Sequence, residues 1–460
     1  MRTWTFVACC LAVSWLGSSA VSSQPRTQPR AVLYEGARLI TGDGNAAIES
    51  SAFLVESGRI VTVGTRGAVA LPAGAERVDL TGKTVMPALI NAHAHVGYEK
   101  YTSAEGDSRP EHFTAENILD HLQREAFYGV GTVLDAGSGA LDIGGEFLLD
   151  QEARKLAPSA QLLLMAGIVP PNGGPDHILI KGTRPLRANF EVTRSPEARA
   201  AVQTAAAKNI RHIKIWIGDR RGTYPAMPHE VYDAIIDEAH KLGIKVHAHA
   251  TSLRDYKDVL RAGADVLVHT IQAEKLDDEV LSLIREKKPY WTTVFGLGDR
   301  SELCDDNPFV AQVYSAKMIA DVRATDCRPA ANAAAREQTL KYNFTKMIES
   351  GARLALGTDA GVWPRYSFGW ADHHELGRYV QLGLTPAQAI VTATSRAAEL
   401  LGVTDAGTLA AGKRADFLVL NANPLENISN TRQIANVYLR GVRLDREAVL
   451  ARIKRANGTN

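Results

Sequence analysis

Short apolar segments alternate with amphipathic segments through the middle of the chain. The apolar segments predict strands, and most segments between them have a helical period, such as residues 228–242 before Gly243. Eight parallel strands with crossover helices over roughly 270 residues predict a (β/α)8 TIM barrel within residues 85–403. The predicted strands are residues 85–95, 131–135, 161–167, 212–217, 244–249, 265–269, 289–295 and 353–359.

Both ends of the chain have a different pattern. Residues 31–84 and 404–445 contain short apolar runs separated by turns, without a helical period. This pattern is typical of antiparallel β-structure. We expect the two segments to form one composite β-sandwich, with the barrel inserted between them. The predicted fold class is therefore α/β, a barrel with a small second domain built from both chain ends.

The first residues have the pattern of a secretory signal peptide, which we assign to residues 1–23. Arg2 is a short basic region, an apolar run extends from Phe6 to Leu16, and Ser18 to Ala20 are small. The apolar run is too short to span a membrane comfortably. We therefore expect an exported protein, periplasmic or secreted, without membrane attachment once the signal is removed.

The composition narrows the class of partner. Of the 460 residues, 45% are hydrophobic and 22% are charged, and the formal net charge is +1. These values are those of an ordinary globular protein and give no reason to expect nucleic acid or an anionic membrane as a partner. We expect a small-molecule substrate. The oligomeric state stays open, a homo-oligomer included.

Two cysteines remain after the signal is removed, Cys304 and Cys327. An even pair in an oxidising compartment predicts a disulfide. Between them, Asn307 and Pro308 have the pattern of a helix start, and the predicted helix extends to about Arg323. Such a helix would be about 24 Å long, so the short flanking segments can close the bridge with little slack.

The first barrel strand ends in two histidines, His93 and His95. Side chains at positions i and i+2 of a strand point to the same face, so both imidazoles are directed to one point where the strand ends. Two imidazoles supply half of a tetrahedral metal shell. An isolated pair of this kind would more often be two polar residues at a strand end, and the partners farther along the chain favour the metal site.

These partner residues lie within later predicted strands or at their ends. Lys214 lies inside the apolar fourth strand, where an unpaired ammonium group is costly. The fifth strand ends in His247 and His249, the sixth in His269 and the eighth in Asp359. In a (β/α)8 barrel catalytic groups gather at the carboxyl ends of the strands. So many polar groups at successive strand ends are hard to explain by packing.

These motifs resemble the amidohydrolase superfamily. The matching stretches are MPALINAHAHV, IKIW, VHAHA, the single strand-six histidine, LGTDAG and the closing GTLAAGKRADFLVL. More narrowly they resemble its imidazolonepropionase-like branch, which includes metal-dependent prolidases and carboxypeptidases and ochratoxin-hydrolysing amidases. The resemblance covers almost the whole mature chain.

The resemblance implies a centre with two divalent metal ions, zinc being the expected metal. It assigns His93, His95 and Asp359 to the more buried ion, and His247 and His269 to the second. Lys214, carboxylated by carbon dioxide to N6-carboxylysine, would bridge the two ions.

It also implies the roles of two further groups. Asp359 would take a proton from a metal-bridging hydroxide and pass it to the leaving nitrogen. His249 shares a strand face with His247 and would stabilise the oxyanion or orient the substrate. Which of these two histidines is the strand-five ligand stays open.

The sixth strand departs from the family pattern. It contains Val268, His269 and Thr270 where relatives often have Glu-His-Gly. A carboxylate that would hold the histidine tautomer is therefore missing from that position.

Residues in the predicted loops after the strands are candidates for substrate binding. An arginine there could hold a substrate carboxylate with two hydrogen bonds. The candidates are Tyr98, His177, Arg220, Tyr224 and Arg365. His240 is expected to pack in or cap a helix, and His373 and His374 are expected at the surface.

Together these patterns predict an exported metal-dependent amidohydrolase that cleaves a carbon–nitrogen amide bond. N-acyl amino acids or dipeptides with a free carboxylate, Xaa-Pro among them, are the expected substrates. The alternative is a lactone, carbamate or phosphotriester hydrolase that uses the same dinuclear centre. A metal-free binding protein would not be expected to keep so many unpaired polar groups in an apolar barrel.

Overall fold

The computed structural model describes residues 31–100, 108–174, 189–219, 222, 225–298, 301–305, 307–327, 332–362 and 368–457. The predicted signal peptide lies outside the described residues. The strands are β1 (Val32–Glu35), β2 (Arg38–Leu39), β3 (Ser51–Glu56), β4 (Arg59–Thr65), β5 (Glu76–Asp79), β6 (Thr84–Pro87), β7 (Leu89–Ala94), β8 (Val130–Asp135), β9 (Gln161–Leu164), β10 (Ala166–Val169), β11 (Asn189–Glu191), β12 (His212–Trp216), β13 (Lys245–His249), β14 (Val266–Val268), β15 (Tyr290–Thr292), β16 (Arg353–Leu354), β17 (Phe417–Leu420), β18 (Ile434–Leu439) and β19 (Val442–Arg443).

The α-helices fill most of the intervals between the central strands. They are α1 (Ala115–Phe127), α2 (Leu141–Glu152), α4 (Ser195–Ala207), α5 (His229–Lys241), α6 (Leu253–Ala262), α7 (Asp278–Lys287), α8 (Ser301–Cys304), α9 (Pro308–Ala311), α10 (Ala316–Asp326), α11 (Ala333–Glu349), α12 (Trp370–Gln381), α13 (Pro386–Thr392), α14 (Ser395–Leu401) and α15 (Arg446–Ala456). Short 3-10 helices occupy Pro110–His112, Phe295–Gly298 and Ile428–Arg432. None of the described helices is long and apolar enough to cross a membrane.

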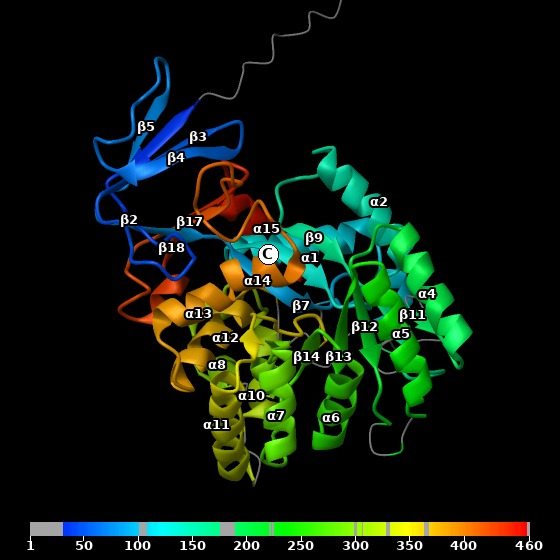
Figure 1. Ribbon diagram of the computed structural model, residues 1–460. Coiled ribbons are helices and arrows are strands. Elements are labelled where there is room, and N and C mark those ends of the chain that lie inside the picture. The colour runs from blue at the N-terminus through cyan, green and yellow to red at the C-terminus, as the bar shows by residue number, and fades with distance from the viewer. Residues whose placement is uncertain are drawn as a thin grey trace, which may run out of the picture.

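The central strands pair in parallel and follow the chain order except at β11, which lies at a sheet edge beside β10. Within the described residues they form a three-stranded sheet, β7-β8-β9, and a seven-stranded sheet that runs from β11 and β10 through β12 to β16. The segment after β16 bonds to β7, because Ala92 N donates to Leu356 O and His95 N donates to Ala360 O at 2.9 and 2.7 Å. Helices α4, α5, α6 and α7 lie on the outer side of these strands (Figure 1). The carboxyl ends of β7 and of β12 to β16 are thereby collected on one side.

The predicted strands differ from the observed ones at two places. The apolar segment 85–95 is divided between β6 and β7, because β6 pairs with β17 and β7 pairs with β8. The segment 353–359 is a regular strand only at Arg353–Leu354, although its backbone continues to bond to β7. The physical reason is the same in both cases, since an apolar run indicates burial and not the sheet in which a strand pairs.

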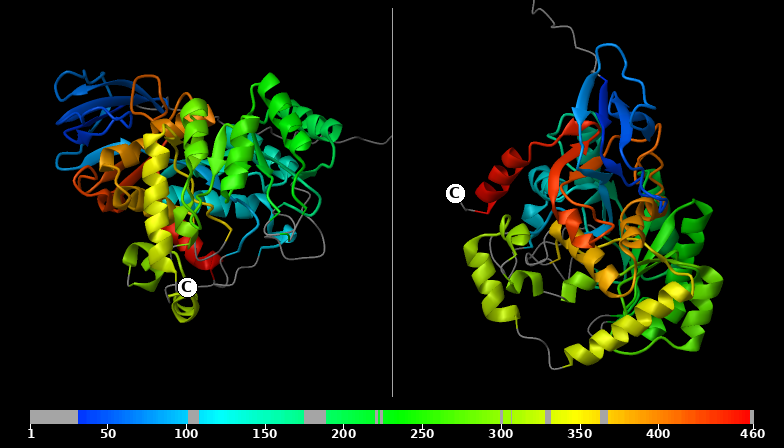
Figure 2. Two further views of the ribbon diagram at one scale, coloured as in Figure 1. Left: turned by 60° about the horizontal axis from the view of Figure 1, so that its bottom comes forward. Right: turned by 90° about the vertical axis from the view of Figure 1, so that its left-hand side faces the viewer.

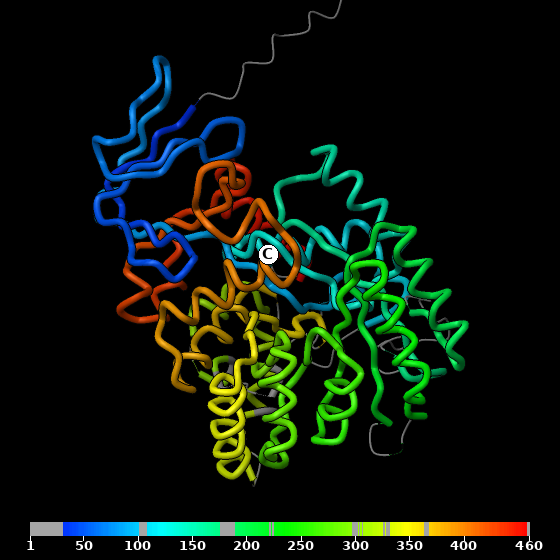
Figure 3. Tube along the Cα trace, in the orientation of Figure 1, coloured from blue at the N-terminus to red at the C-terminus, as the bar shows by residue number. Residues whose placement is uncertain are grey.

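The two ends of the chain pack together, as the tube in Figure 3 and the right-hand view in Figure 2 show. A four-stranded sheet, β4-β3-β1-β5, and a five-stranded sheet, β19-β18-β17-β6-β2, share one hydrophobic cluster. In this cluster Phe53 from the first sheet and Tyr438 from the second contact Tyr34, with ring centroids 5.0 and 5.3 Å away. Most strand pairs in these two sheets are antiparallel, as expected, but β1–β5 and β2–β6 are parallel. The chain between β4 and β5 crosses to the opposite edge of its sheet, so β5 runs in the direction of β1.

The single helix predicted from Asn307 to Arg323 is also wrong. The structure has two helices there, α9 and α10. Ser315 begins α10, since its side chain accepts a hydrogen bond from Met318 N. Serine at this position satisfies a free amide at the start of a new helix, and this signal was missed in the sequence. The break between α9 and α10 lets the chain turn back on itself.

A disulfide joins Cys304 at the end of α8 to Cys327, the residue that follows α10. The two Cα atoms are 5.6 Å apart and the residues are 23 positions apart in sequence. A loop of this length contributes about 3 kcal/mol to the free energy of unfolding by the chain-entropy estimate. The disulfide therefore fixes the two ends of the helical segment that follows β15.

We predict that replacing both cysteines, in Cys304→Ser/Cys327→Ser, lowers the free energy of unfolding by about 3 kcal/mol. Denaturant titration of protein that begins after residue 23 measures this change. Reduced wild-type protein should match the variant, and added reductant should leave the variant unchanged. Two thiols that titrate in the native wild type would contradict the bridge.

Candidate metal centre

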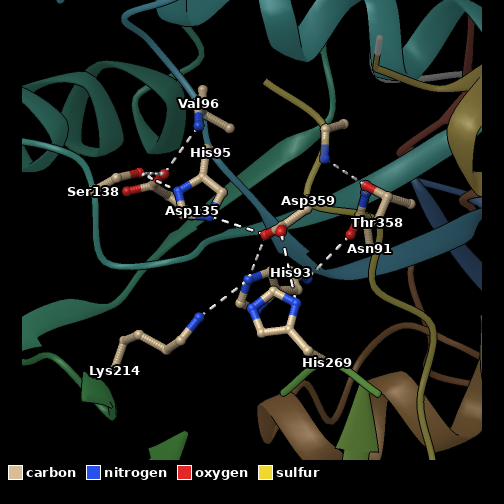
Figure 4. Close-up of polar contacts among 11 residues, drawn as sticks. Asn91, His93, His95, Val96, Asp135, Ser138, Lys214, His269, Thr358 and Asp359 are labelled. Atoms are coloured by element: carbon tan, nitrogen blue, oxygen red, sulfur yellow. Dashed lines mark hydrogen bonds and ion pairs between the residues drawn. The ribbon is translucent and has the colours of Figure 1, made fainter. Parts of the chain in front are cut away.

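Two histidines of β7 and its extension converge on one carboxylate. His93 Nε2 and His95 Nε2 lie 2.9 and 3.0 Å from Oδ1 of Asp359, and all three residues are buried. Their candidate ligand atoms lie within 4.8 Å of one another. Figure 4 shows the two rings and the carboxylate pointing toward a common point. Backbone pairing produces this arrangement, because Thr358 N and Asp359 N both donate to His93 O at 2.9 Å.

Lys214 approaches the same point from β12. Its Nζ atom lies 3.2 Å from His93 Nε2 and 4.9 Å from the centroid of the Trp216 ring. The side chain is buried, so the amine lies inside the molecule and next to a candidate ligand. Figure 4 shows the lysine extended toward the histidines and Asp359. A primary amine at this position is close enough to the two imidazoles and the carboxylate to belong to the same centre.

His95 is held by a short polar chain that starts at the end of β8. Its Nδ1 lies 2.7 Å from Ser138 Oγ, and Ser138 Oγ donates to Asp135 Oδ1 at 3.3 Å. Asp135 also accepts from Val96 N and Gly139 N. Because the Ser138 hydroxyl proton points to Asp135, its oxygen accepts the Nδ1 proton of His95. The sequence carried a signal for Asp135, the polar last residue of β8, whereas no local pattern marked Ser138.

The residues present fit a metal ion. In this tautomer the His95 ring offers only a lone pair at Nε2. That lone pair and the Asp359 carboxylate oxygen are both electron donors, yet they face each other at 3.0 Å in a buried site. A cation bound between imidazole and carboxylate groups resolves this conflict, and such a donor set suits zinc and related ions.

The protonation states agree with a ligand role. Burial alone would raise the pKa of the Asp359 carboxyl, but the charge of His269 and the hydrogen bond with His93 outweigh it and hold the pKa well below its usual range. Burial, assisted by the charge of Lys214, lowers the pKa of His93 well below its usual value. A carboxylate and a neutral imidazole are the forms that bind metal ions.

The backbone adopts left-handed angles at two of these residues. His269 has φ 77° and Asp359 has φ 59°. Such angles are costly for residues other than glycine and persist where surrounding contacts enforce them. The carbonyl of His269 accepts hydrogen bonds from Tyr256 Oη and Trp291 Nε1, each at 2.8 Å. These contacts hold the end of β14 in the absence of the carboxylate that relatives often have before the histidine.

The remaining histidines separate into two pairs. His269 lies with Nδ1 3.9 Å from Asp359 Oδ2, and the His249 ring contacts it edge-on with centroids 4.4 Å apart. His247 is fully buried, and its Nε2 lies 3.1 Å from Nδ1 of His212. The sequence interpretation did not single out His212, since one histidine at the start of a strand carries no special pattern.

A second buried polar cluster supports the base of the centre. Asn91 accepts from His93 N through its side-chain oxygen, and its amide lies 2.9 Å from Thr358 Oγ1. The same amide lies 3.3 and 3.4 Å from the carboxyls of Glu125 and Asp372. Burial and the neighbouring Asp372 carboxyl raise the pKa of Glu125 well above its usual value, and burial likewise raises the pKa of Asp372. The two carboxyls therefore share a proton at neutral pH.

A large cleft opens over the centre, with a volume of about 1770 Å³. Its floor is formed at the carboxyl ends of the central strands by His95, Lys214, Trp216, His249, His269 and Asp359. Arg336 of α11 lies on its wall. The candidate ligands thus lie at the bottom of a space large enough for a small-molecule substrate.

The amidohydrolase family profile matches residues 84–444. The chain belongs to the amidohydrolase family. An imidazolonepropionase from Deinococcus radiodurans is 25% identical over 410 residues, which cover 86% of this chain and 92% of that protein. A putative prolidase from Bifidobacterium longum has a TM-score of 0.69 at 24% identity, over 93% of this chain and 100% of that chain. The A. niger ochratoxinase structure has a TM-score of 0.66 at 19% identity, over 91% and 96% of the two chains. The family membership predicted from the motifs is confirmed, and the chain is a hydrolase that acts on carbon–nitrogen bonds.

For most of the predicted substrate-binding residues of this amidohydrolase the structure gives no position. His177, Arg220, Tyr224 and Arg365 lie outside the described residues. Tyr98 is described and is fully buried in the hydrophobic core, so its side chain packs inside the molecule instead of lining the cleft. The physical reason is that a short apolar extension after β7 is covered by α1.

We expected no role in the site for His240, His373 and His374, and each of these histidines has a structural partner. The expectation that His373 and His374 lie at the surface is wrong, because both are buried in α12. His373 bonds to Thr431 Oγ1 and Tyr128 O, and His374 Nδ1 lies 2.9 Å from Glu302 Oε1. Residues from distant parts of the chain, among them Tyr128, Glu302 and Thr431, cover α12. His240 is exposed on α5 and bonds to Asp265.

We predict that Glu125→Gln/Asp372→Asn gains stability relative to the wild type as the pH rises above about 4, the usual carboxyl pKa. The folded wild type keeps a proton that the unfolded chain releases, so this pair contributes stability that is full below that pH and is lost as the pH rises through the raised pKa. The slope of the difference is about 1.4 kcal/mol per pH unit for one proton. Denaturant titrations of metal-free protein between pH 5 and 8 measure it, with the surface variant Asp150→Asn as control. A constant difference over this range would show that the pair holds no extra proton.

Proposed function

We propose that this amidohydrolase is an exported, metal-dependent enzyme that hydrolyses the amide bond of N-acyl amino acids or dipeptides. The observation that carries the proposal is the convergence of His93 with His95, Lys214 and Asp359, the last three of which line the cleft. Imidazolonepropionase and prolidase, the names of similar proteins, both denote hydrolysis of a carbon–nitrogen bond. The pattern of residues 1–23 supports export.

The proposed centre holds two divalent ions, zinc in the first instance. His93, His95 and Asp359 would hold one ion, and His247 and His269 would hold the other. Addition of carbon dioxide to the Lys214 amine, with release of protons, would convert a buried cation into an anionic ligand for both ions. Bound metal ions would lower the pKa of bound water, which gives a nucleophile at neutral pH, and would polarise the scissile carbonyl.

The side chains of this chain supply the proton transfers and the orientation. Asp359 stays ionised in the free site, so it accepts a proton during attack and donates it to the leaving nitrogen. His249 lines the cleft beside His269 and orients the substrate or stabilises the oxyanion. Ser138 and Asp135 keep His95 in one tautomer, so that its lone pair stays directed to the centre.

The proposal also concerns how the described sheets combine into domains. We infer that the three-stranded and seven-stranded sheets are parts of one closed (β/α)8 barrel. The backbone bonds between β7 and the segment after β16, and the direct succession of β9 and β10, support this inference. We likewise assign the two sheets of the chain ends to one composite β-sandwich, which their common hydrophobic cluster supports.

A hydrolysis screen of zinc-loaded protein tests the function. We expect cleavage of N-acyl amino acids or dipeptides, and we predict that Asp359→Asn lowers kcat by roughly 10² or more, the scale of lost acid–base catalysis. If lactones, carbamates or phosphotriesters are hydrolysed and no amide is cleaved, the same centre acts on a different type of bond. Near-normal turnover by a fully metallated Asp359→Asn variant would remove this residue from the mechanism.

We predict that Lys214→Ala loses the second ion and most of the activity, while His93 and His95 retain the first ion. Because a carboxylated lysine presents a small carboxylate, short-chain carboxylic acids with metal should partly restore the variant, and ammonium compounds should not. Metal analysis and intact mass under native conditions measure the change, and the surface variant Lys208→Ala is the control. One ion per chain in fully active wild type would contradict the bridged pair.

A further inference from the structure

A pair of buried histidines lies beneath the centre, and the roles described so far use only one of them. His212 begins β12, and His247 lies in the middle of the neighbouring strand β13. Nδ1 of His212 lies 3.1 Å from Nε2 of His247. Nε2 of His212 lies 3.3 Å from the carbonyl oxygen of Leu401. Both side chains are buried, so water does not replace these partners.

The carbonyl group of Leu401 determines which ring nitrogens of His212 and His247 carry a proton. Leu401 is the last residue of α14, and a carbonyl at the end of a helix has no partner within the helix. A carbonyl oxygen accepts and does not donate, so Nε2 of His212 carries the proton. Nδ1 of the neutral ring is then a lone pair, and it accepts the Nε2 proton of His247. The remaining ring nitrogen of His247, Nδ1, is left with a lone pair.

The structure gives that lone pair no protein partner. Nδ1 of His247 is buried and has no hydrogen-bond partner among the described residues. His247 and Lys214 are paired in register across β12 and β13, so their side chains lie on the same face of the sheet. Lys214 reaches His93 on that face. A buried lone pair next to the metal centre is an incomplete arrangement that a cation completes.

We propose that His212 is a positioning residue for the metal centre, which directs Nδ1 of His247 to the second ion by fixing the tautomer of that ring. This inference rests on the proposed dinuclear centre. It also selects His247, and not His249, as the ligand from β13. His249 lines the cleft and packs against His269, a position from which it can contact substrate.

Two substitutions at His212 separate positioning from packing. His212→Leu removes the acceptor for the His247 proton, so we expect the affinity for the second zinc ion to fall about 10- to 100-fold, the usual effect of losing such a partner. In His212→Asn the side-chain oxygen occupies a place near the former Nδ1, so the second ion should be retained. The matched control is His373→Leu, since His373 is also buried and bonded to a backbone carbonyl, far from this pair. It should lower stability without loss of metal.

Zinc titration followed by metal analysis measures the number of ions and their affinities. Nitrogen-15 NMR of histidine-labelled, metal-free wild type measures the tautomer directly, and the proton of His247 should reside on Nε2. A proton on Nδ1, or a folded His212→Leu variant with unchanged affinity for the second ion, would overturn the proposal. The NMR result depends on neither metal nor activity, so it tests the histidine row even if the hydrolysis screen fails. If His212→Leu does not fold, His212→Asn decides, because loss of the second ion from that folded variant also contradicts the proposal.

Discussion

The site depends on the backbone pairing between the first central strand and the segment that follows the last one. His93 O accepts hydrogen bonds from Thr358 N and Asp359 N, although these residues are far apart in the chain. The pairing places the Asp359 carboxylate against two imidazoles in a buried environment, where charges interact strongly because water is excluded. Asp359 also has a left-handed backbone angle, so backbone strain occurs at a candidate ligand.

The polar groups around the candidate ligands have a common design. Ser138 and Asp135 hold His95, Asn91 holds the backbone of His93, and His212 holds His247. An imidazole binds metal well when its other nitrogen is bonded, because the bond keeps the lone pair aimed at the ion. Residues of β7, of the end of β8 and of β12 thus hold three of the candidate ligands in place.

The sixth strand shows how a missing family feature is replaced. The resemblance to the family leads us to expect a carboxylate before the strand-six histidine, and this chain has Val268 there. Tyr256 and Trp291 instead bond to the carbonyl of His269 and fix its backbone. The side chain is further held by the edge-on contact with His249. The main-chain hydrogen bonds and the ring contact thus both help to set the position of the imidazole.

The sequence by itself determined the family, the α/β class and the groups that meet at the centre, because strand period and strand ends are local properties. His93 and His95 share a face for that reason, and Asp359 ends its segment for the same reason. Only the tertiary structure decided which polar residues support them. Ser138, Asn91 and His212 gain their roles from contacts with other elements, and the burial of His373 and His374 comes from packing against distant segments. Such contacts depend on register between strands and on helix packing, and a local pattern carries no record of either.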